Sequence, residues 1–225
     1  MPGTLYGVGV GPGDKRLLTL LAIETLTMAD KIVVPDSGGE KTAYKIVQEY
    51  ITHKEKIYCH LPMTRDEASL ASAHTAAANT IISELKSGAN VAFITLGDPT
   101  IYSTYMYIHR LVLAQGYNCE IINGIPSFCA VAGKLNISLC DKADPLHIIP
   151  ASYANTEQML KLSGTKVLMK SGKDLAGVVN LLAESGQIDQ AQMVECCFME
   201  NEKIYTDLRA VDSSSYFSVI VIKEK

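Results

Sequence analysis

The strongest constraint in this sequence is the regular alternation of short β-rich runs with longer amphipathic segments over residues 1–136. Each amphipathic segment is long enough to cross over between two parallel strands. The predicted strands cover residues 5–10, 31–34, 56–60, 91–95 and 118–122. The predicted helices cover about 15–29, 41–52, 66–87, 101–115 and 126–136. This pattern indicates an α/β domain with a mainly parallel five-stranded sheet.

The pattern changes at residues 141–145, where two aspartates, a lysine and a proline fall together. We place a domain boundary here, with residues 1–142 in the first domain and 143–225 in the second. The predicted strands beyond it cover residues 146–150, 166–169, 193–199, 202–208 and 216–223, with helices near 155–162 and 174–185. Only Glu200 and Asn201 separate two of these strands, which favours an antiparallel hairpin. The second domain is therefore expected to be α/β with a mixed or antiparallel sheet.

Composition and charge exclude several classes of protein. Hydrophobic residues make up 48% of the chain and charged residues 20%, as in folded globular proteins. No apolar run is long enough to span a membrane, no secretion signal is visible, and six cysteines without a C-x-x-C pair fit a reducing cytoplasm. A net charge of −4 argues against nucleic-acid binding. The five histidines lack metal-binding spacing, so no protein-bound metal is expected.

A glycine-rich loop, residues 7–14 (GVGVGPGD), follows the first predicted strand. It does not match the dinucleotide pattern G-x-G-x-x-G, because the third glycine position falls on Pro12 or Asp14. Asp14 would suit the N-cap of a helix that starts near Lys15. The sequence leaves open whether the loop is a capped turn or lines a substrate. The P-loop sequence is absent, which excludes a P-loop nucleotidase.

Two further loops follow predicted strands of the first domain. Residues 96–101 (LGDPTI) follow the fourth strand, and residues 123–128 (NGIPSF) follow the fifth. Open α/β sheets bind ligands at the carboxyl ends of their parallel strands. Asp98 and Ser127 alone could merely cap the next helix. Three such loops at successive strand ends, however, predict one shared binding crevice.

Two cysteines and a serine cluster lie in the second domain. Cys196 and Cys197 fall within the predicted strand 193–199, where neighbouring side chains point to opposite faces. We therefore expect them to pack in the core and not to act as a ligand pair. The three serines at 213–215 carry no pattern for covalent catalysis and are expected to form a loop.

Together these motifs resemble the tetrapyrrole methylase family, whose members use S-adenosylmethionine (SAM) to methylate uroporphyrinogen, precorrins or cobalt-precorrins. The resemblance spans the chain through GVGVGPGD, LLTLLAIETL, ADKIVVPDS, TLGDPTIYSTYMYI, GIPSFCAVAG, KVLMKSG and VECCFMENEKI. VVPDS, GDPTIYSTY and GIPSFCAVAG look most similar to the precorrin-2 and cobalt-precorrin-2 (cobalt-factor II) C20-methyltransferases of cobalamin biosynthesis. The resemblance implies two α/β domains, an active site in the cleft between them, and a homodimer.

The resemblance also implies which residues bind the cofactor and the substrate. SAM contacts are implied for Leu96, Gly97, Asp98, Ile101, Ser127, Phe128, Met169, Cys197, Tyr216 and Phe217. The trough for the tetrapyrrole would be lined by Pro12, Gly13 and Asp14. The substrate carries many carboxylates, so basic residues are expected at the rim of this trough. The candidates are Lys15, Arg16, Lys41, Lys45 and Arg65. At Cys196 and Cys197 this chain departs from the glycine that many relatives carry.

Methyl transfer from SAM to an electron-rich meso carbon mainly requires alignment of the carbon, the methyl group and the sulfur. No nucleophilic side chain is needed, and the sequence does not identify the base that removes the C20 proton. It also does not distinguish precorrin-2 from its cobalt form, since the metal arrives with the substrate. The alternatives are a methylase acting at another tetrapyrrole position, a diphthine synthase, an NAD-linked oxidoreductase and a nonenzymatic ligand carrier.

Overall fold

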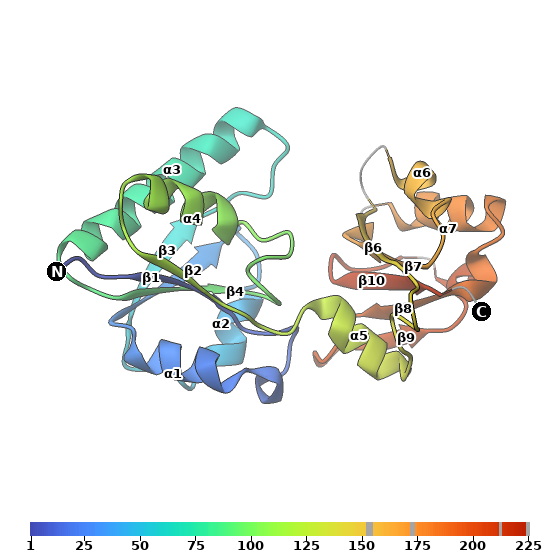
Figure 1. Ribbon diagram of the computed structural model, residues 1–225, viewed down its shortest axis with the longest axis horizontal. Coiled ribbons are helices and arrows are strands. Elements are labelled where there is room, and N and C mark those ends of the chain that lie inside the picture. The colour runs from blue at the N-terminus through green and yellow to red at the C-terminus, as the bar shows by residue number, and fades with distance from the viewer. Residues whose placement is uncertain (152–154, 172–173, 212, 224–225) are drawn as a thin grey trace. The chain divides into compact units, whose positions relative to one another are not determined.

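Two β-sheets organise the chain, one in each of two units, Met1–Pro126 and Ser127–Lys225 (Figure 1). The computed structural model describes residues 1–151, 155–171, 174–211 and 213–223. No helix within these ranges is both long and apolar enough to cross a membrane.

The sheet of the first unit has five strands in the order β3-β2-β4-β1-β5, and all neighbouring strands run parallel. The strands are β1 (Leu5–Gly9), β2 (Lys31–Asp36), β3 (Glu55–His60), β4 (Val91–Thr95) and β5 (Cys119–Ile122). Strands buried on both faces read as continuous apolar runs, as in VAFIT of β4. The predicted five-stranded parallel sheet is confirmed.

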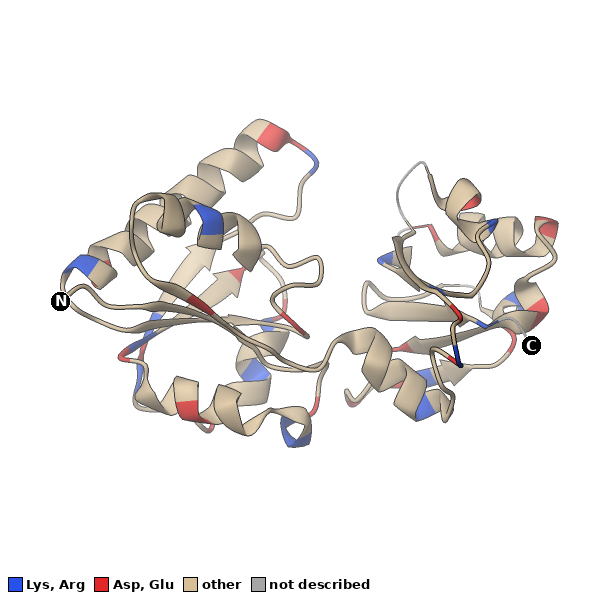
Figure 2. Ribbon diagram, viewed as in Figure 1, with Lys and Arg blue, Asp and Glu red and all other residues tan. Residues whose placement is uncertain are grey.

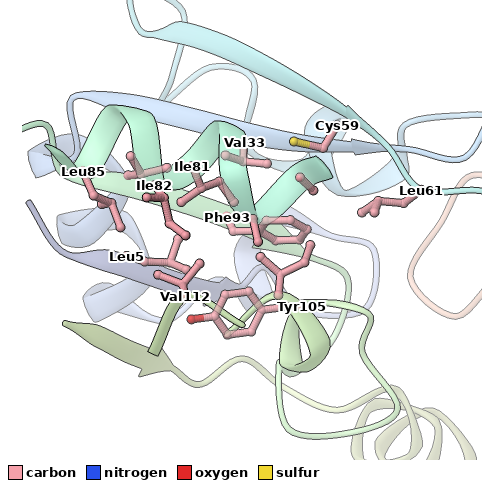
Figure 3. Close-up of a cluster of buried hydrophobic side chains, with 14 residues drawn as sticks. Leu5, Val33, Cys59, Leu61, Ile81, Ile82, Leu85, Phe93, Tyr105 and Val112 are labelled. Carbon is pink, nitrogen blue, oxygen red and sulfur yellow. The ribbon is translucent and has the colours of Figure 1, made fainter. Parts of the chain in front are cut away.

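Helices cover both faces of this sheet (Figure 1). They are α1 (Leu20–Met28), α2 (Thr42–Val47), α3 (Glu67–Lys86) and α4 (Tyr105–Ala114). On one face, Ile81 of α3 and Tyr105 of α4 belong to the same buried cluster as Phe93 of β4 (Figure 3). On the other face, Leu26 of α1 and Ile46 of α2 pack in a second cluster. The first unit is therefore a three-layer α/β/α domain.

The helix predicted over residues 15–29 is interrupted. Lys15–Leu17 form a short 3-10 turn, capped by the Asp14 carboxylate, which accepts a hydrogen bond from the backbone N–H of Arg16. Helix α1 starts afresh after Thr19, whose hydroxyl accepts a hydrogen bond from the backbone N–H of Ala22. Both residue types favour N-cap positions, so each begins its own element. The prediction of a single helix was wrong, because Thr19 is a second N-cap and starts a separate helix.

The sheet of the second unit has the order β6-β7-β10-β8-β9. Its strands are β6 (Leu146–Pro150), β7 (Thr165–Met169), β8 (Ala191–Glu195), β9 (Lys203–Tyr205) and β10 (Ser218–Ile222). The β6–β7 pair is parallel and the other three pairs are antiparallel, which confirms the predicted mixed sheet. Helices α6 (Thr156–Leu160) and α7 (Leu175–Glu184) add Leu160 and Leu182 to the apolar cluster around Leu168 and Ile220.

Helix α5 (Ser127–Leu135) contacts β8 and β10 and so groups with the second unit. The boundary predicted at residues 142 and 143 placed this helix in the first domain instead. In the sequence, α5 continues the alternation of strands and helices that marks the first unit. Periodicity identifies a helix and its apolar face, but it does not say which sheet that face covers.

The connection between β8 and β9 differs from the prediction. The two strands are antiparallel, as expected, but residues 196–202 form the connection where the sequence predicted a two-residue turn. Cys196 and Phe198 have φ angles of +50° and +61°. Such angles lie outside the β region, so the strand ends at Glu195.

Candidate functional site

The loops that follow β1 and β4 are bonded to each other through their backbones. Gly11 and Gly97 form an antiparallel bridge, in which the Gly97 N–H donates to the Gly11 carbonyl at 2.8 Å and the Gly11 N–H donates to the Gly97 carbonyl at 3.2 Å. Their φ angles are +74° and +71°, in the left-handed region that glycine adopts without strain. These glycines therefore hold two strand-end loops together.

Asp98 joins the loop after β4 to the loop after β5. Its side chain is buried, at 5% exposure. Oδ1 accepts hydrogen bonds from the backbone N–H (2.8 Å) and the hydroxyl of Thr100. Oδ2 accepts hydrogen bonds from Asn123 Nδ2 (3.0 Å) and the Gly124 N–H (3.1 Å). The three loops thus converge at one edge of the sheet, as the sequence predicted.

The electrostatics of Asp98 follow from these bonds. Burial alone would raise the pKa of Asp98, but the hydrogen bonds from Thr100, Asn123 and Gly124 outweigh it and lower the pKa from its ordinary value of 3.8. The carboxylate is therefore ionised at neutral pH, and both of its oxygens are used within the loops. Asp98 thus fixes the turn after β4, whereas α4 begins farther on, at Tyr105.

No side chain fits where the three loops touch. A Cβ atom on Gly9 would lie 2.6 Å from the Gly124 nitrogen and 2.7 Å from the Gly97 oxygen. A Cβ atom on Gly124 would lie 2.2 Å from the same Gly97 oxygen. These distances are below van der Waals contact, so only glycine allows the backbones to approach this closely. Gly9 of GVGVGPGD is therefore required for packing of the loops, and not for binding a dinucleotide as in the G-x-G-x-x-G pattern.

Pro12, Gly13 and Asp14, predicted to line the substrate trough, lie in the loop between β1 and the 3-10 turn. The Asp14 carboxylate also accepts a hydrogen bond from the guanidinium of Arg16, with Nη2 and Oδ2 2.6 Å apart. The Arg16 side chain is 80% exposed, so it remains accessible to a ligand. The structure therefore confirms the N-cap that the sequence allowed for Asp14.

Three of the other basic residues predicted at the rim form ion pairs. The pairs are Lys15 with Glu49 (2.8 Å), Lys41 with Asp36 (3.1 Å) and Lys45 with Glu40. Arg65 is exposed in the loop between β3 and α3. In both units, Lys and Arg are interspersed with Asp and Glu (Figure 2). Ion pairs that water reaches contribute little to stability, so an acidic ligand could replace the carboxylate partner at little cost.

Four of the residues predicted to bind SAM lie at one edge of the second sheet. Because β10 runs antiparallel to β7 and β8, the start of β10 lies beside the ends of these two strands. Met169 ends β7, Cys197 follows β8, and Tyr216 and Phe217 precede β10. The rings of Tyr216 and Phe217 meet edge to face, with centroids 5.4 Å apart. The fold therefore gathers three segments that are distant in the sequence.

The remaining residues predicted to contact SAM are mostly apolar. Leu96 packs against the apolar cluster beneath α1 and α2, and the Ile101 N–H donates to the Asp98 carbonyl at 3.3 Å. Ser127 is the first residue of α5, and Phe128 beside it is buried. None of these remaining residues is charged, so they offer a ligand mainly backbone groups and apolar surface.

Both cysteines after β8 are buried, as predicted, but they lie in the connection and not on a strand. Burial, together with the nearby Glu202 carboxylate, raises the pKa of the Cys197 thiol to about 12. Cys197 is therefore a neutral thiol at physiological pH. Its environment suits packing and not nucleophilic chemistry.

A cavity of about 440 Å³ lies between β3 and α3, lined by residues that include Tyr58, His60 and Ala73. None of the predicted site residues is among the described residues that line it. Within the described ranges, no group of three or more His, Cys, Asp or Glu side chains could hold a metal ion.

Comparison with known proteins identifies the family of this chain. Residues 4–212 match the profile of the tetrapyrrole (corrin/porphyrin) methylases. Because this match covers most of the chain, the protein belongs to the tetrapyrrole methylase family.

Individual relatives are similar over nearly their full length. The chain is 35% identical to a probable cobalt-precorrin-2 C(20)-methyltransferase of Methanocaldococcus jannaschii, covering 97% of this chain and 95% of that protein. It is 31% identical to a precorrin-2 C(20)-methyltransferase of Sinorhizobium sp., covering 98% and 95%. Among solved structures, uroporphyrin-III C-methyltransferase from Thermus thermophilus, complexed with S-adenosylhomocysteine, has a TM-score of 0.75 at 17% identity and covers 99% of this chain and 98% of its own. The last likeness shows the fold.

Proposed function

We propose that this protein is a SAM-dependent C-methyltransferase that methylates the C20 meso carbon of precorrin-2 or cobalt-precorrin-2. The observation that carries the proposal is the similarity, over nearly the whole chain, to two proteins named as C20-methyltransferases, one for each form of the substrate. The family to which the chain belongs methylates corrins and porphyrins. The reaction would serve cobalamin biosynthesis.

The SAM-binding residues that we propose fall into two sets, one in each unit. The first set is Leu96, Gly97, Asp98 and Ile101, and the second is Ser127, Phe128, Met169, Cys197, Tyr216 and Phe217. The bonded loops of the first unit and the shared sheet edge of the second support this assignment. Since the Asp98 carboxylate is used within the loops, its effect on SAM would come through loop geometry.

The chemistry asks for placement more than for reactive side chains. SAM, when bound, supplies a methyl group on a sulfonium, and the chain must align it with the nucleophilic carbon. The glycine loops suit this role, because their close packing fixes the backbone without side chains in the way. A neutral Cys197 thiol is consistent with a mechanism that has no covalent enzyme intermediate.

The acidic tetrapyrrole would lie against Pro12, Gly13 and Asp14, with Arg16 and Arg65 binding its carboxylates. Arginine forks match carboxylates well, and both Arg16 and Arg65 are exposed. Lys15, Lys41 and Lys45 are further rim candidates, since their ion pairs are exposed or only partly buried.

The decisive experiment supplies the purified protein with precorrin-2 or cobalt-precorrin-2 and SAM labelled with carbon-13 in the methyl group. We expect one added methyl group by mass spectrometry and label on the meso carbon between rings A and D by NMR. In parallel incubations, label at C2 or C7 when uroporphyrinogen is supplied, or at C11 or C17 when a later intermediate is supplied, would overturn the C20 assignment. Methylation of translation elongation factor in place of any tetrapyrrole would indicate a diphthine synthase, and NAD binding without SAM binding would indicate an oxidoreductase.

We also propose, from the family likeness, that the protein acts in the cytoplasm as a homodimer. Sedimentation equilibrium should then give a mass of about twice the 24.4 kDa of one chain. A single species of 24.4 kDa at micromolar concentration would contradict the dimer. Recovery of the native protein in a membrane fraction would contradict the location.

A further inference from the structure

The connection after β8 holds an unusual backbone. Cys196 and Phe198 both adopt positive φ angles, +50° and +61°, although neither is glycine. Non-glycine residues in the left-handed region are strained and persist only where their surroundings enforce the conformation. Cys197, one of the residues that we propose to contact SAM, lies between them. The position of Cys197 therefore depends on whatever enforces these two angles.

Glu202 closes this connection from its far end. Its Oε2 accepts a hydrogen bond from the Phe198 N–H at 2.6 Å. Two backbone bonds support the same turn: the Met199 N–H donates to the Cys196 carbonyl at 2.9 Å, and the Glu202 N–H donates to the Met199 carbonyl at 3.2 Å. The Glu202 carboxylate thus bonds to Phe198, which has the more positive φ angle of the two residues.

Lys134 of α5 braces the same turn from a different element. Its Nζ lies 2.9 Å from Glu202 Oε1 and 4.1 Å from the centroid of the Phe198 ring. The Lys134 and Glu202 side chains are only 30% and 21% exposed, so water screens this pair less than the fully exposed pairs. The ammonium therefore contacts both the carboxylate that holds the turn and the aromatic ring that the turn carries.

We propose that Lys134 and Glu202 are positioning residues for SAM: together they hold the backbone of residues 196–198 in the conformation that presents Cys197 to the cofactor. This inference rests on the proposed function. The Cys197 thiol is neutral and buried. It has no charge to offer, so any contact with the cofactor depends on where the backbone places the residue. Without this clamp of Lys134 and Glu202, Phe198 would relax toward an ordinary φ angle and carry Cys197 away.

The test measures affinity for S-adenosylhomocysteine by calorimetry without a tetrapyrrole, alongside steady-state kinetics and thermal unfolding. The variants are Lys134→Met, Glu202→Gln and their combination. We expect each single change to raise the Kd for S-adenosylhomocysteine and the KM for SAM roughly tenfold, the scale of one lost charge-assisted hydrogen bond. The kcat at saturating SAM and the KM for the tetrapyrrole should change by less than about threefold, because only the position of the turn is altered.

Two controls separate positioning from a general loss of stability. Lys161→Met and Glu157→Gln break an ion pair of the same 2.9 Å length elsewhere in the second unit and should leave the Kd unchanged. Lys134→Arg keeps the charge and should restore most of the affinity. The double variant should bind about as weakly as each single variant, since both changes disable one clamp.

The outcomes distinguish the inference from the function beneath it. If the unaltered protein binds no S-adenosylhomocysteine, the proposed function fails. If it binds the ligand and both single variants bind equally well, the clamp is overturned while the function stands. The clamp would likewise be overturned if the Lys161→Met and Glu157→Gln controls raised the Kd for S-adenosylhomocysteine as much as the Lys134 and Glu202 variants do. It would also be overturned if Lys134→Arg bound S-adenosylhomocysteine as weakly as Lys134→Met.

Discussion

Replacing Asp98 with alanine should lower the free energy of unfolding by roughly 3 to 5 kcal/mol and weaken SAM binding at least tenfold. The substitution leaves the donors of Thr100, Asn123 and Gly124 without their acceptor, and each buried group left unsatisfied costs about 1 to 3 kcal/mol. The two loops would then lose the carboxylate that joins them. Urea denaturation and calorimetric titration with SAM measure the two effects.

Asp66→Ala provides the matched control. Asp66 also accepts a hydrogen bond from a backbone N–H, that of Ser69 at 3.1 Å, but it is an exposed N-cap of α3. Its loss should cost about 1 kcal/mol and leave SAM affinity unchanged. If Asp98→Ala destabilised the protein no more than Asp66→Ala, the bonded carboxylate would not be what holds the loops.

The same bonds predict how the Asp98 contribution depends on pH. Since the pKa of Asp98 in the folded protein lies below its ordinary value of 3.8, the ionised carboxylate stabilises the fold above that pH. This stabilisation is lost as the pH falls through the lower, folded-state pKa. The difference in unfolding free energy between the unaltered protein and Asp98→Ala should therefore stay constant from about pH 8 to pH 5 and shrink below about pH 4. A difference that grew on acidification would contradict the assignment.

Replacing Gly9 with alanine should destabilise the protein by about 3 kcal/mol and impair SAM binding. The added methyl group would lie 2.6 Å from the Gly124 nitrogen and 2.7 Å from the Gly97 oxygen. Both neighbours are backbone atoms, so the loops themselves must move apart, and overpacking of this kind costs about 1 to 3 kcal/mol or more. Thermal or urea unfolding and SAM titration give the two readouts.

Gly39→Ala, in the connection between β2 and α2, is the corresponding control. A Cβ atom there meets nothing within 4 Å. Its unfolding free energy should stay within about 0.5 kcal/mol of the unaltered protein, with normal SAM binding. Equal behaviour of the Gly9 and Gly39 variants would show that close contact between the loops is not needed.

Much of the first unit could be predicted because its signals are local. The buried strands are short aliphatic runs such as VAFIT, and α3 shows one apolar stripe, so both elements follow from periodicity. The convergence of the loops also followed, since parallel strands end at the same edge. By contrast, the break in the helix over 15–29 was not predicted, because the second cap, Thr19, lies within a helical pattern.

The missed features depend on contacts between distant positions. The partner of Asp98 in the next loop, Asn123, lies 25 positions along the chain, and Lys134 and Glu202 are 68 positions apart. The residue types at 196 and 198 do not indicate positive φ angles, because neither Cys196 nor Phe198 is glycine or asparagine. The sequence therefore predicted a strand that continues to residue 199, whereas β8 ends at Glu195.

The edge where the three glycine loops touch has a consequence for how such a protein can diversify. Backbone meets backbone there, and an added Cβ at Gly9 or Gly124 would collide with main-chain atoms. A mutation at these positions can break the junction but cannot add a new side chain that reads a different ligand. New specificity must therefore arise from residues that flank the junction, such as Thr100, Ile101 and Ser127, while the junction itself tolerates no change.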